Sequence, residues 1–237
     1  MSAYDGTVPV IGLAHGSRHP RGGEAIEQLM RAVGELVGGP SRVAYLDLAQ
    51  PDLEAVAAEL AAEGHRRAVV VPLLFTVAFH ATVDVPEAVA AAAESSGLEL
   101  MVSDILGTGD DVAEVLTQAM ADAGIGAHSS LALFAVGSSN PAANAAVADL
   151  ATRLGVRHGT AARAAFGTCA PRFDAVRPEL ADPVAIVPLF LAEGLLLDPM
   201  RSRATEEGWL MSAPLADLAA PIVRDRYDRA LTSVELG

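Results

Sequence analysis

Two histidines and an aspartate occur in the first half of the chain at nearly equal intervals. His15, Asp47 and His80 are separated by 32 and 33 residues, and each stands at or shortly after the end of an apolar run. Two imidazoles and a carboxylate form a borderline-soft ligand set that suits Fe, Co, Ni or Zn. Histidine, with a pKa of about 6.5, is mostly neutral at pH 7 and can bind a cation or accept a proton. These residues predict a divalent-metal site that can also move protons.

The elements that must position these residues are short apolar segments alternating with helical ones. Four segments of the first half have strand length and β-branched content, at residues 8–14, 42–47, 68–75 and 98–103. Alanine-rich segments with helical spacing lie between them. This alternation predicts an α/β fold with a parallel sheet whose strands all end at one rim. We therefore expect the two histidines and the aspartate to gather there.

The second half of the chain repeats the first. The phrases "LAHGSRHP", "PDLEAVAAEL" and "VPLLF" return as "FAVGSSNP", "PRFDAVRPEL" and "VPLFL", at offsets of 121, 120 and 116 residues. Further strands are predicted at 130–136, 162–167 and 184–191, and helices at 141–154, 171–181 and 216–233. Such self-similarity indicates a duplicated α/β unit. We predict two lobes, 1–124 and 125–237, whose parallel sheets face one another across a cleft.

The duplication supplies an internal control for the candidate site. At the positions that match the two histidines and the aspartate, the second half carries Val136, Gly167 and Leu196. Residues that only supported the fold would be needed in both copies, although two copies can also drift apart. The joint replacement favours one site, in the N-terminal lobe, with the C-terminal lobe as a degenerate repeat that forms a wall of the cleft.

The composition of the chain limits which classes of partner the protein is expected to bind. The net charge of −14 argues against nucleic-acid binding, which normally needs a basic face. The single cysteine, Cys169, excludes an internal disulfide and fits a reducing compartment. The N-terminus has no signal-peptide pattern, and no apolar segment reaches the roughly 18 residues of a membrane span. We expect a soluble cytoplasmic protein without a nucleic-acid or membrane partner.

Three stretches together resemble a known family. "LAHGSRHPRG" (13–22), "VAYLDLAQP" (43–51) and "VVVPLLFTVAFHATVDVP" (69–86) are similar to the phrases of the class II tetrapyrrole chelatases, the sirohydrochlorin chelatase (CbiX/SirB) family in its long, two-lobed form. The resemblance implies two flavodoxin-like lobes with the active site between them. It also implies insertion of Fe²⁺, for siroheme, or Co²⁺, toward cobalamin, into sirohydrochlorin. In this reaction the metal is a substrate, and no permanently bound cofactor is expected.

The resemblance also assigns roles to residues. His15 and His80 match the family's two metal-site histidines and are the catalytic candidates, and Asp47 falls where longer members often have an acidic residue. The carboxylates of sirohydrochlorin would need arginines in so acidic a protein. The substrate-binding candidates are Ser17, Arg18, Arg21, Arg201 and Arg203. The alternative for each arginine is a solvated surface group. A duplicated chain can satisfy within itself the contact that a single-lobe relative would make by dimerising, so we expect a monomer.

Two other functions fit part of the pattern. A non-catalytic carrier of metal or tetrapyrrole would use the same residues. A histidine-phosphatase-like enzyme would also place a histidine before a glycine after a strand, but it needs an arginine directly before that histidine, where this chain has Ala14.

Overall fold

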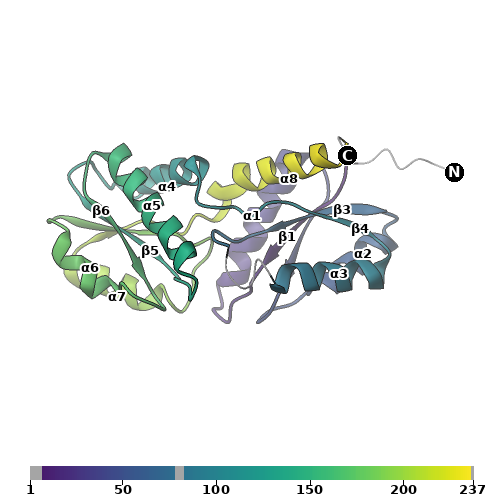
Figure 1. Cartoon of the computed structure of the whole chain (residues 1–237), viewed down its shortest axis with the longest axis horizontal. Helices are drawn as coiled ribbons and strands as arrows, with labels where there is room; N and C mark the ends of the chain where they lie inside the picture. The colour runs from purple at the N-terminus through teal and green to yellow at the C-terminus, as the bar shows by residue number, and fades with distance from the viewer. Residues whose placement is uncertain (1–6, 78–82, 236–237) are drawn as a thin grey trace. The chain divides into compact units, whose positions relative to one another are not determined.

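The computed structural model describes residues 7–77 and 83–235 and divides into two compact units (Figure 1). Unit 1 comprises Met1–Gly107 and Ala219–Gly237, and unit 2 comprises Thr108–Leu218. This division differs from the boundary expected at 124/125. The chain leaves unit 1 before the last helix of the first repeat, and it returns to unit 1 before the last helix of the second repeat.

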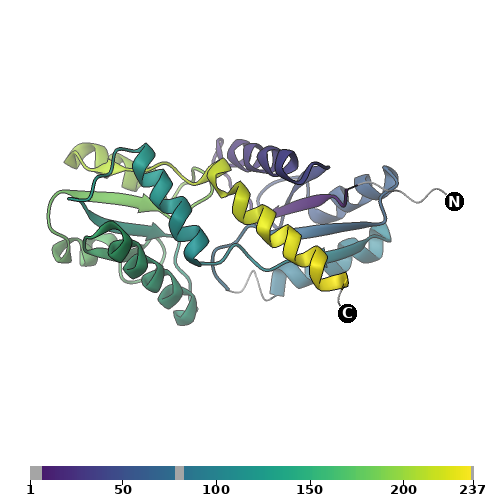
Figure 2. The ribbon, with the colours of Figure 1, turned by 90° about the horizontal axis from the view of Figure 1, so that it is seen from above.

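Unit 1 is a four-stranded parallel sheet in the order β2-β1-β3-β4, the strand order of a flavodoxin-like sheet. Its strands are β1 (Val10–Ala14), β2 (Ser41–Tyr45), β3 (Arg67–Pro72) and β4 (Glu99–Val102). Its helices are α1 (Gly22–Val37), α2 (Leu53–Ala62), α3 (Val85–Ser96) and α8 (Ala220–Glu235). Figures 1 and 2 show α1 and α8 side by side over the strands, and α2 packs against α3.

The alternation of side chains along β1 explains how both faces of this sheet are covered. Ile11 and Leu13 point into a buried cluster with residues of α2 and α3, such as Val56. Gly12 faces the opposite side of the sheet, toward α1. A Cβ on Gly12 would stand 2.4 Å from the sulfur of Met30, so glycine here lets α1 pack directly on the strand. The glycine thus allows close packing of α1 on the strand, while large aliphatic side chains such as Leu13 and Leu60 fill the core on the other face.

Unit 2 repeats this plan, with strand order β6-β5-β7-β8 and all strands parallel. Its strands are β5 (Ser130–Ala135), β6 (Ala162–Phe166), β7 (Val184–Pro188) and β8 (Leu210–Met211). Its helices are α4 (Asp110–Asp122), α5 (Pro141–His158), α6 (Phe173–Val176) and α7 (Asp198–Glu207), with the 3-10 turn η2 (Arg177–Glu179). A second 3-10 turn, η3 (Ala216–Ala219), stands where the chain returns to unit 1. The duplicated α/β fold is confirmed. The sequence did not predict α7 and β8, and the helix expected at 171–181 is α6 followed by η2.

The last helix of each repeat packs in the unit formed by the other repeat. Helix α4 lies against α5, whereas α8 lies against α1, β3 and β4. Buried Arg226 of α8 donates to the carbonyls of Ile105 (3.0 Å) and Leu106 (2.5 Å). The hydroxyl of Tyr227 donates to the carbonyl of Val8 (2.7 Å). Satisfied polar groups thus anchor α8 to the segment that leaves unit 1, through Arg226, and to the residues before β1, through Tyr227.

The rims of both sheets end on prolines. Pro72 and Pro188 are the last residues of β3 and β7, and proline, which has no backbone N–H to donate, suits the end of a strand. One further backbone bond follows each proline, from the N–H of Leu73 to the carbonyl of Leu13 and from the N–H of Leu189 to the carbonyl of Phe134, both at 2.8 Å.

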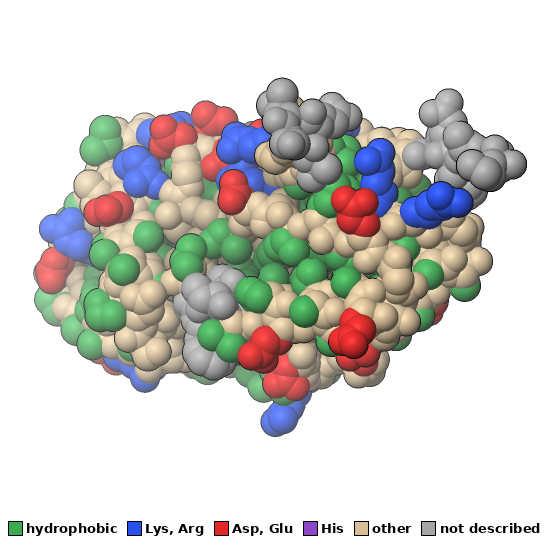
Figure 3. Space-filling model, turned by 45° about the vertical axis from the view of Figure 1, so that its right-hand side comes forward, with side chains coloured by type: hydrophobic (Ala, Val, Ile, Leu, Met, Phe, Trp, Pro, Cys, Tyr) green, Lys and Arg blue, Asp and Glu red, His purple; other side chains and the backbone are tan. Residues whose placement is uncertain are grey.

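The surface carries charges of both signs. On the face drawn in Figure 3, acidic and basic side chains lie interspersed among hydrophobic ones. Across the described part of the chain, no helix combines the length and the apolar character needed to cross a bilayer.

Candidate active site

The carboxyl rim of the unit 1 sheet brings two of the predicted residues together. Ala14 and Tyr45 are paired where β1 and β2 end. One residue further along β1, His15 accepts a hydrogen bond at its carbonyl from the N–H of Asp47, at 3.0 Å. His15 is half-buried and Asp47 is exposed. The predicted adjacency of this imidazole and this carboxylate at one rim therefore holds at the level of the backbone.

The side chain of Asp47 is held by its own turn. Its Oδ1 accepts a hydrogen bond from the N–H of Leu48, at 2.7 Å, and Leu48 has a positive φ of 60°. A carboxylate fixed by one oxygen at an exposed rim keeps its negative charge in place there. Such a charge favours a nearby cation.

Gly16 is the point where the loops after β1 and β2 touch. Its φ is 98°, a left-handed value that disfavours other residues. A Cβ at this position would stand 1.8 Å from the carbonyl oxygen of Asp47. Glycine is therefore required for the close approach that sets His15 beside Asp47.

The third predicted ligand, His80, lies outside the described residues, which omit 78–82. Before it, β3 ends on Pro72, which is paired with Leu13 of β1, so the third strand ends at the same rim. Among the described residues no group of three His, Cys, Asp or Glu side chains is placed to hold a metal. The metal set of His15, Asp47 and His80 stays a prediction.

The turn after His15 is built by hydrogen bonds within itself. The hydroxyl of Ser17 accepts from the N–H of His19, at 3.0 Å. The matching turn of unit 2 has the same bond, from the N–H of Asn140 to the hydroxyl of Ser138, also at 3.0 Å. The Gly-Ser-x-x-Pro frame thus shapes the strand-to-helix connection in both repeats. Ser17 has a local structural partner in addition to any role toward a substrate.

The four predicted arginines fall into different environments. Arg18 and Arg21 are exposed, in and just after this turn. Arg201 and Arg203 lie on α7 of unit 2. Their roles toward a substrate stay predictions.

The two arginines of α7 differ in what they contact. Arg203 pairs with Asp174, and its guanidinium carbon lies 5.0 Å from the ring centre of Phe173 and 5.6 Å from that of Trp209. It therefore packs α7 onto α6. Arg201 donates to Glu193 at 2.7 Å.

Glu193 is a residue that the sequence reasoning missed. It is four-fifths buried by side chain and follows the end of β7 by five residues. Its Oε2 and the Nε of Arg201 are buried and lack a hydrogen-bond partner among the described residues. An isolated glutamate in an apolar loop carries no spacing pattern, so its position after a strand end was the single available indication.

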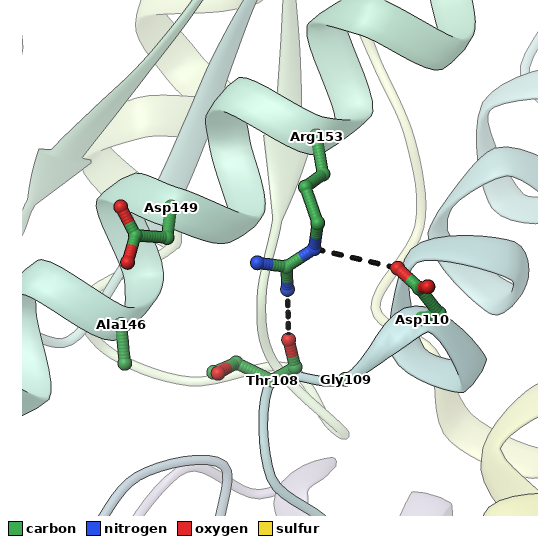
Figure 4. Close-up of a pocket in the computed structure, with 6 residues that line it drawn as sticks. All are labelled: Thr108, Gly109, Asp110, Ala146, Asp149 and Arg153. Atoms are coloured by element: carbon green, nitrogen blue, oxygen red, sulfur yellow. Dashed lines mark hydrogen bonds and ion pairs between the residues drawn. The ribbon is translucent and has the colours of Figure 1, made fainter.

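An open cavity of about 420 Å³ lies elsewhere in unit 2 (Figure 4). It is lined by residues of the α4 amino end and of α5: Thr108, Gly109, Asp110, Ala146, Asp149 and Arg153. Arg153 points across it to the carbonyl of Thr108 and to Asp110. None of the predicted site residues lines this cavity.

The fold and the rim define a duplicated, two-unit α/β protein with its polar rim residues in the first repeat. The sequence matches the CbiX family over residues 9–123 and 130–207, so the chain belongs to the CbiX family. No curated protein matches the chain.

Three solved structures are similar to it. SirB from Bacillus subtilis with Fe³⁺ has a TM-score of 0.80 at 21% identity and covers 97% of both chains. The sirohydrochlorin chelatase SirB from Bacillus subtilis subspecies spizizenii, in complex with cobalt, has a TM-score of 0.79 at 20% identity, with the same coverage. CbiX, the terminal enzyme for biosynthesis of siroheme in denitrifying bacteria, has a TM-score of 0.68 at 18% identity over 95% of this chain and 98% of its own. At such identities the likeness shows the fold.

Proposed function

We propose that this chain is a chelatase that inserts a divalent metal, Fe²⁺ or Co²⁺, into sirohydrochlorin. The observation that carries the proposal is the pairing of His15 and Asp47 at one rim, with Val136 and Gly167 at the matching positions of the other repeat. Membership of the CbiX family supports the same reaction. The SirB relative that is named a sirohydrochlorin chelatase holds cobalt.

The reaction needs a site that takes a cation, releases it, and removes protons. The metal enters the macrocycle as M²⁺, and two pyrrole N–H protons leave, so charge balances without a change of oxidation state. In the proposal, neutral His15 and His80 hold the arriving ion through ring nitrogens and then accept the protons. Asp47 adds negative charge beside them. Because the site would supply only two or three protein ligands, coordination positions of the ion stay open and the ion can pass to the macrocycle.

Substrate carboxylates would be met by Arg18 and Arg21 near the same turn and by the arginines of α7 in unit 2. Of these, Arg203 already has an acidic partner and two aromatic neighbours, so Arg201 is the better candidate on that helix. We further propose that the chain acts as a cytoplasmic monomer without a resident cofactor. Each compact unit already contains a helix from both repeats, so no second copy is needed to complete it.

The test is metal insertion followed by the visible spectrum. Purified full-length chain is mixed with sirohydrochlorin and Co²⁺, or with Fe²⁺ under anaerobic conditions. His15→Ala and His80→Ala should each lower the rate at least about 100-fold, because each removes a ligand and a proton acceptor. The control is His128→Ala, an exposed histidine in the loop before β5, which should keep the full rate.

Each outcome has a distinct meaning. No acceleration over the spontaneous reaction would refute the chelatase proposal, and tight binding of metal and tetrapyrrole without acceleration would indicate a carrier. Full activity in both rim variants would refute the site while leaving the reaction in place.

A further inference from the structure

The cavity of unit 2 lies between the amino end of α4 and one face of α5, so it is contained within a single compact unit (Figure 4). Its volume of about 420 Å³ falls in the range of small-molecule sites. Ala146, Asp149 and Arg153 follow one another on α5 at steps of three and four residues, which places them on the same side of the helix. Residues 108–110 close the cavity from the side of α4. The lining therefore combines two carboxylates, one guanidinium and a hydroxyl.

Arg153 is held in one orientation by the amino end of α4. Its Nη2 donates to the carbonyl of Thr108, and its Nε lies 3.4 Å from Oδ1 of Asp110. The same carboxylate oxygen lies 3.3 Å from Nη2 of Arg157, so two guanidinium groups compensate the charge of Asp110. Figure 4 shows the remaining terminal nitrogen of Arg153 directed toward the side of the cavity where Asp149 lies. That nitrogen is placed to donate to a bound molecule.

Asp149 brings an uncompensated charge into the cavity. It is exposed, and no described residue forms an ion pair or a hydrogen bond with its carboxylate. An aspartate and an arginine four residues apart on a helix commonly pair. Here Arg153 is directed across the cavity toward Thr108 and Asp110 instead. The carboxylate of Asp149 and the remaining guanidinium nitrogen thus line the cavity as separate groups of opposite charge.

The first repeat shows that helix packing alone does not require these two charges. At the same offset of 121 residues that relates the two turns, Gln28 and Ala32 of α1 stand where α5 has Asp149 and Arg153. Each of these helices lies against the last helix of the other repeat. Both also bury their matching positions, which are Ile26 and Val147, Leu29 and Leu150, Met30 and Ala151, and Val33 and Leu154. The pair of charges is therefore particular to the cavity of unit 2.

We propose that this cavity binds a small zwitterion of the amino-acid type, with its ammonium group against Asp149 and its carboxylate against Arg153. A simple anion would be repelled by the two carboxylates of the lining, and a simple cation by the guanidinium. A molecule that carries both charges meets a partner of opposite sign at each end. The inference does not rest on the proposed function, since none of the predicted metal or tetrapyrrole residues lines the cavity.

The experiment titrates the isotope-labelled full chain with L-alanine and follows the amide NMR signals of Thr108, Gly109 and Asp110. These signals should shift and saturate with a Kd of about 1 mM, as expected for two charge-assisted contacts at an open site. Ethylamine and propionate each carry one of the two charges of L-alanine. Each should bind at least about tenfold more weakly than L-alanine does.

Two variants test the charge and the space separately. Asp149→Asn removes the negative charge at nearly constant size and should weaken binding of L-alanine about tenfold. Ala146→Leu fills the cavity without changing its charge and should abolish the binding. The matched control is Glu206→Gln, an exposed carboxylate on α7 outside the cavity, which should leave binding unchanged. Thermal unfolding of each variant verifies that it is folded before it is titrated.

The possible results each bear on one part of the inference. The absence of any saturable shift at about 10 mM L-alanine would overturn the site. Propionate or ethylamine binding as tightly as L-alanine would overturn the zwitterion as the class of ligand. Unchanged binding of L-alanine by folded Asp149→Asn would overturn the role of that carboxylate, and unchanged binding by folded Ala146→Leu would mean that the cavity is not the place of binding.

Discussion

The contact between Gly16 and Asp47 sets the geometry of the candidate metal site, and Gly16→Ala tests it. An added Cβ would stand 1.8 Å from the carbonyl oxygen of Asp47, and the φ of 98° is strained for alanine. The strain costs about 1–2 kcal/mol. Moving the loop after β2 to relieve the overlap adds about 1–3 kcal/mol. We expect the free energy of unfolding to fall by about 2–5 kcal/mol in urea titrations.

Gly38→Ala is the matched control, because it carries the strain without the overlap. Gly38 has a φ of 66°, and a Cβ there would meet nothing within 4 Å. The control should lose about 1 kcal/mol and keep its rate of metal insertion. Gly16→Ala should also insert metal more slowly at temperatures where it is folded, because the loop that carries Asp47 must shift. Equal stability losses in the two variants, or an unchanged rate in Gly16→Ala, would refute the reasoning.

Three further predictions concern anchoring groups. Arg226→Met should lower the free energy of unfolding by about 2–4 kcal/mol, because two backbone carbonyls lose a buried donor. The control Arg229→Met, at an exposed position of the same helix, should leave the urea titration nearly unchanged. Equal effects of the two substitutions would contradict the anchoring role of Arg226. Ser17→Ala and Ser138→Ala should each cost about 1 kcal/mol by thermal unfolding, since each hydroxyl accepts a backbone N–H, and a loss in one repeat alone would count against the shared turn. Burial raises the pKa of the Tyr227 hydroxyl. The contribution of this hydroxyl to the stability of the folded protein is therefore fully present below about pH 10 and is lost as the pH rises through the higher folded-state pKa. Tyr227→Phe should flatten this part of a plot of unfolding free energy against pH.

The elements that the sequence predicts well are those with a complete local pattern. Strands β1 and β3 are short buried runs bounded by turns, and both lie within the predicted segments apart from one end residue. Helix α7 was missed because its residues are mostly polar and only Met200 and Ala204 are buried, so it has no apolar stripe. The amphipathic pattern of α8 predicts a helix with one buried face, but it does not say which sheet that face covers.

In the candidate site, too, features set by local sequence could be predicted, whereas those set by long-range packing could not. The adjacency of His15 and Asp47 could be predicted because parallel strands end at one rim. The pairing of Arg201 with Glu193 and the packing of Arg203 on Trp209 could not, since they depend on how α7 is oriented over α6 and the loop after β7. Residue type and position in the sequence assigned both arginines to the substrate, whereas their neighbours in the fold distinguish them.

The two repeats separate what the fold requires from what the chemistry requires. Gly137 has a φ of 89°, and a Cβ there would stand 2.7 Å from the sulfur of Cys169, so the second copy needs this glycine for a loop contact, as the first needs Gly16. The residue directly before each glycine is under no such constraint, because Val136 occupies the position with the turn and its Ser138 hydrogen bond intact. Histidine at position 15 is therefore not required by the turn. Since the frame tolerates an exposed valine in one copy, the turn does not account for the imidazole in the other, and His15 stays a predicted metal ligand.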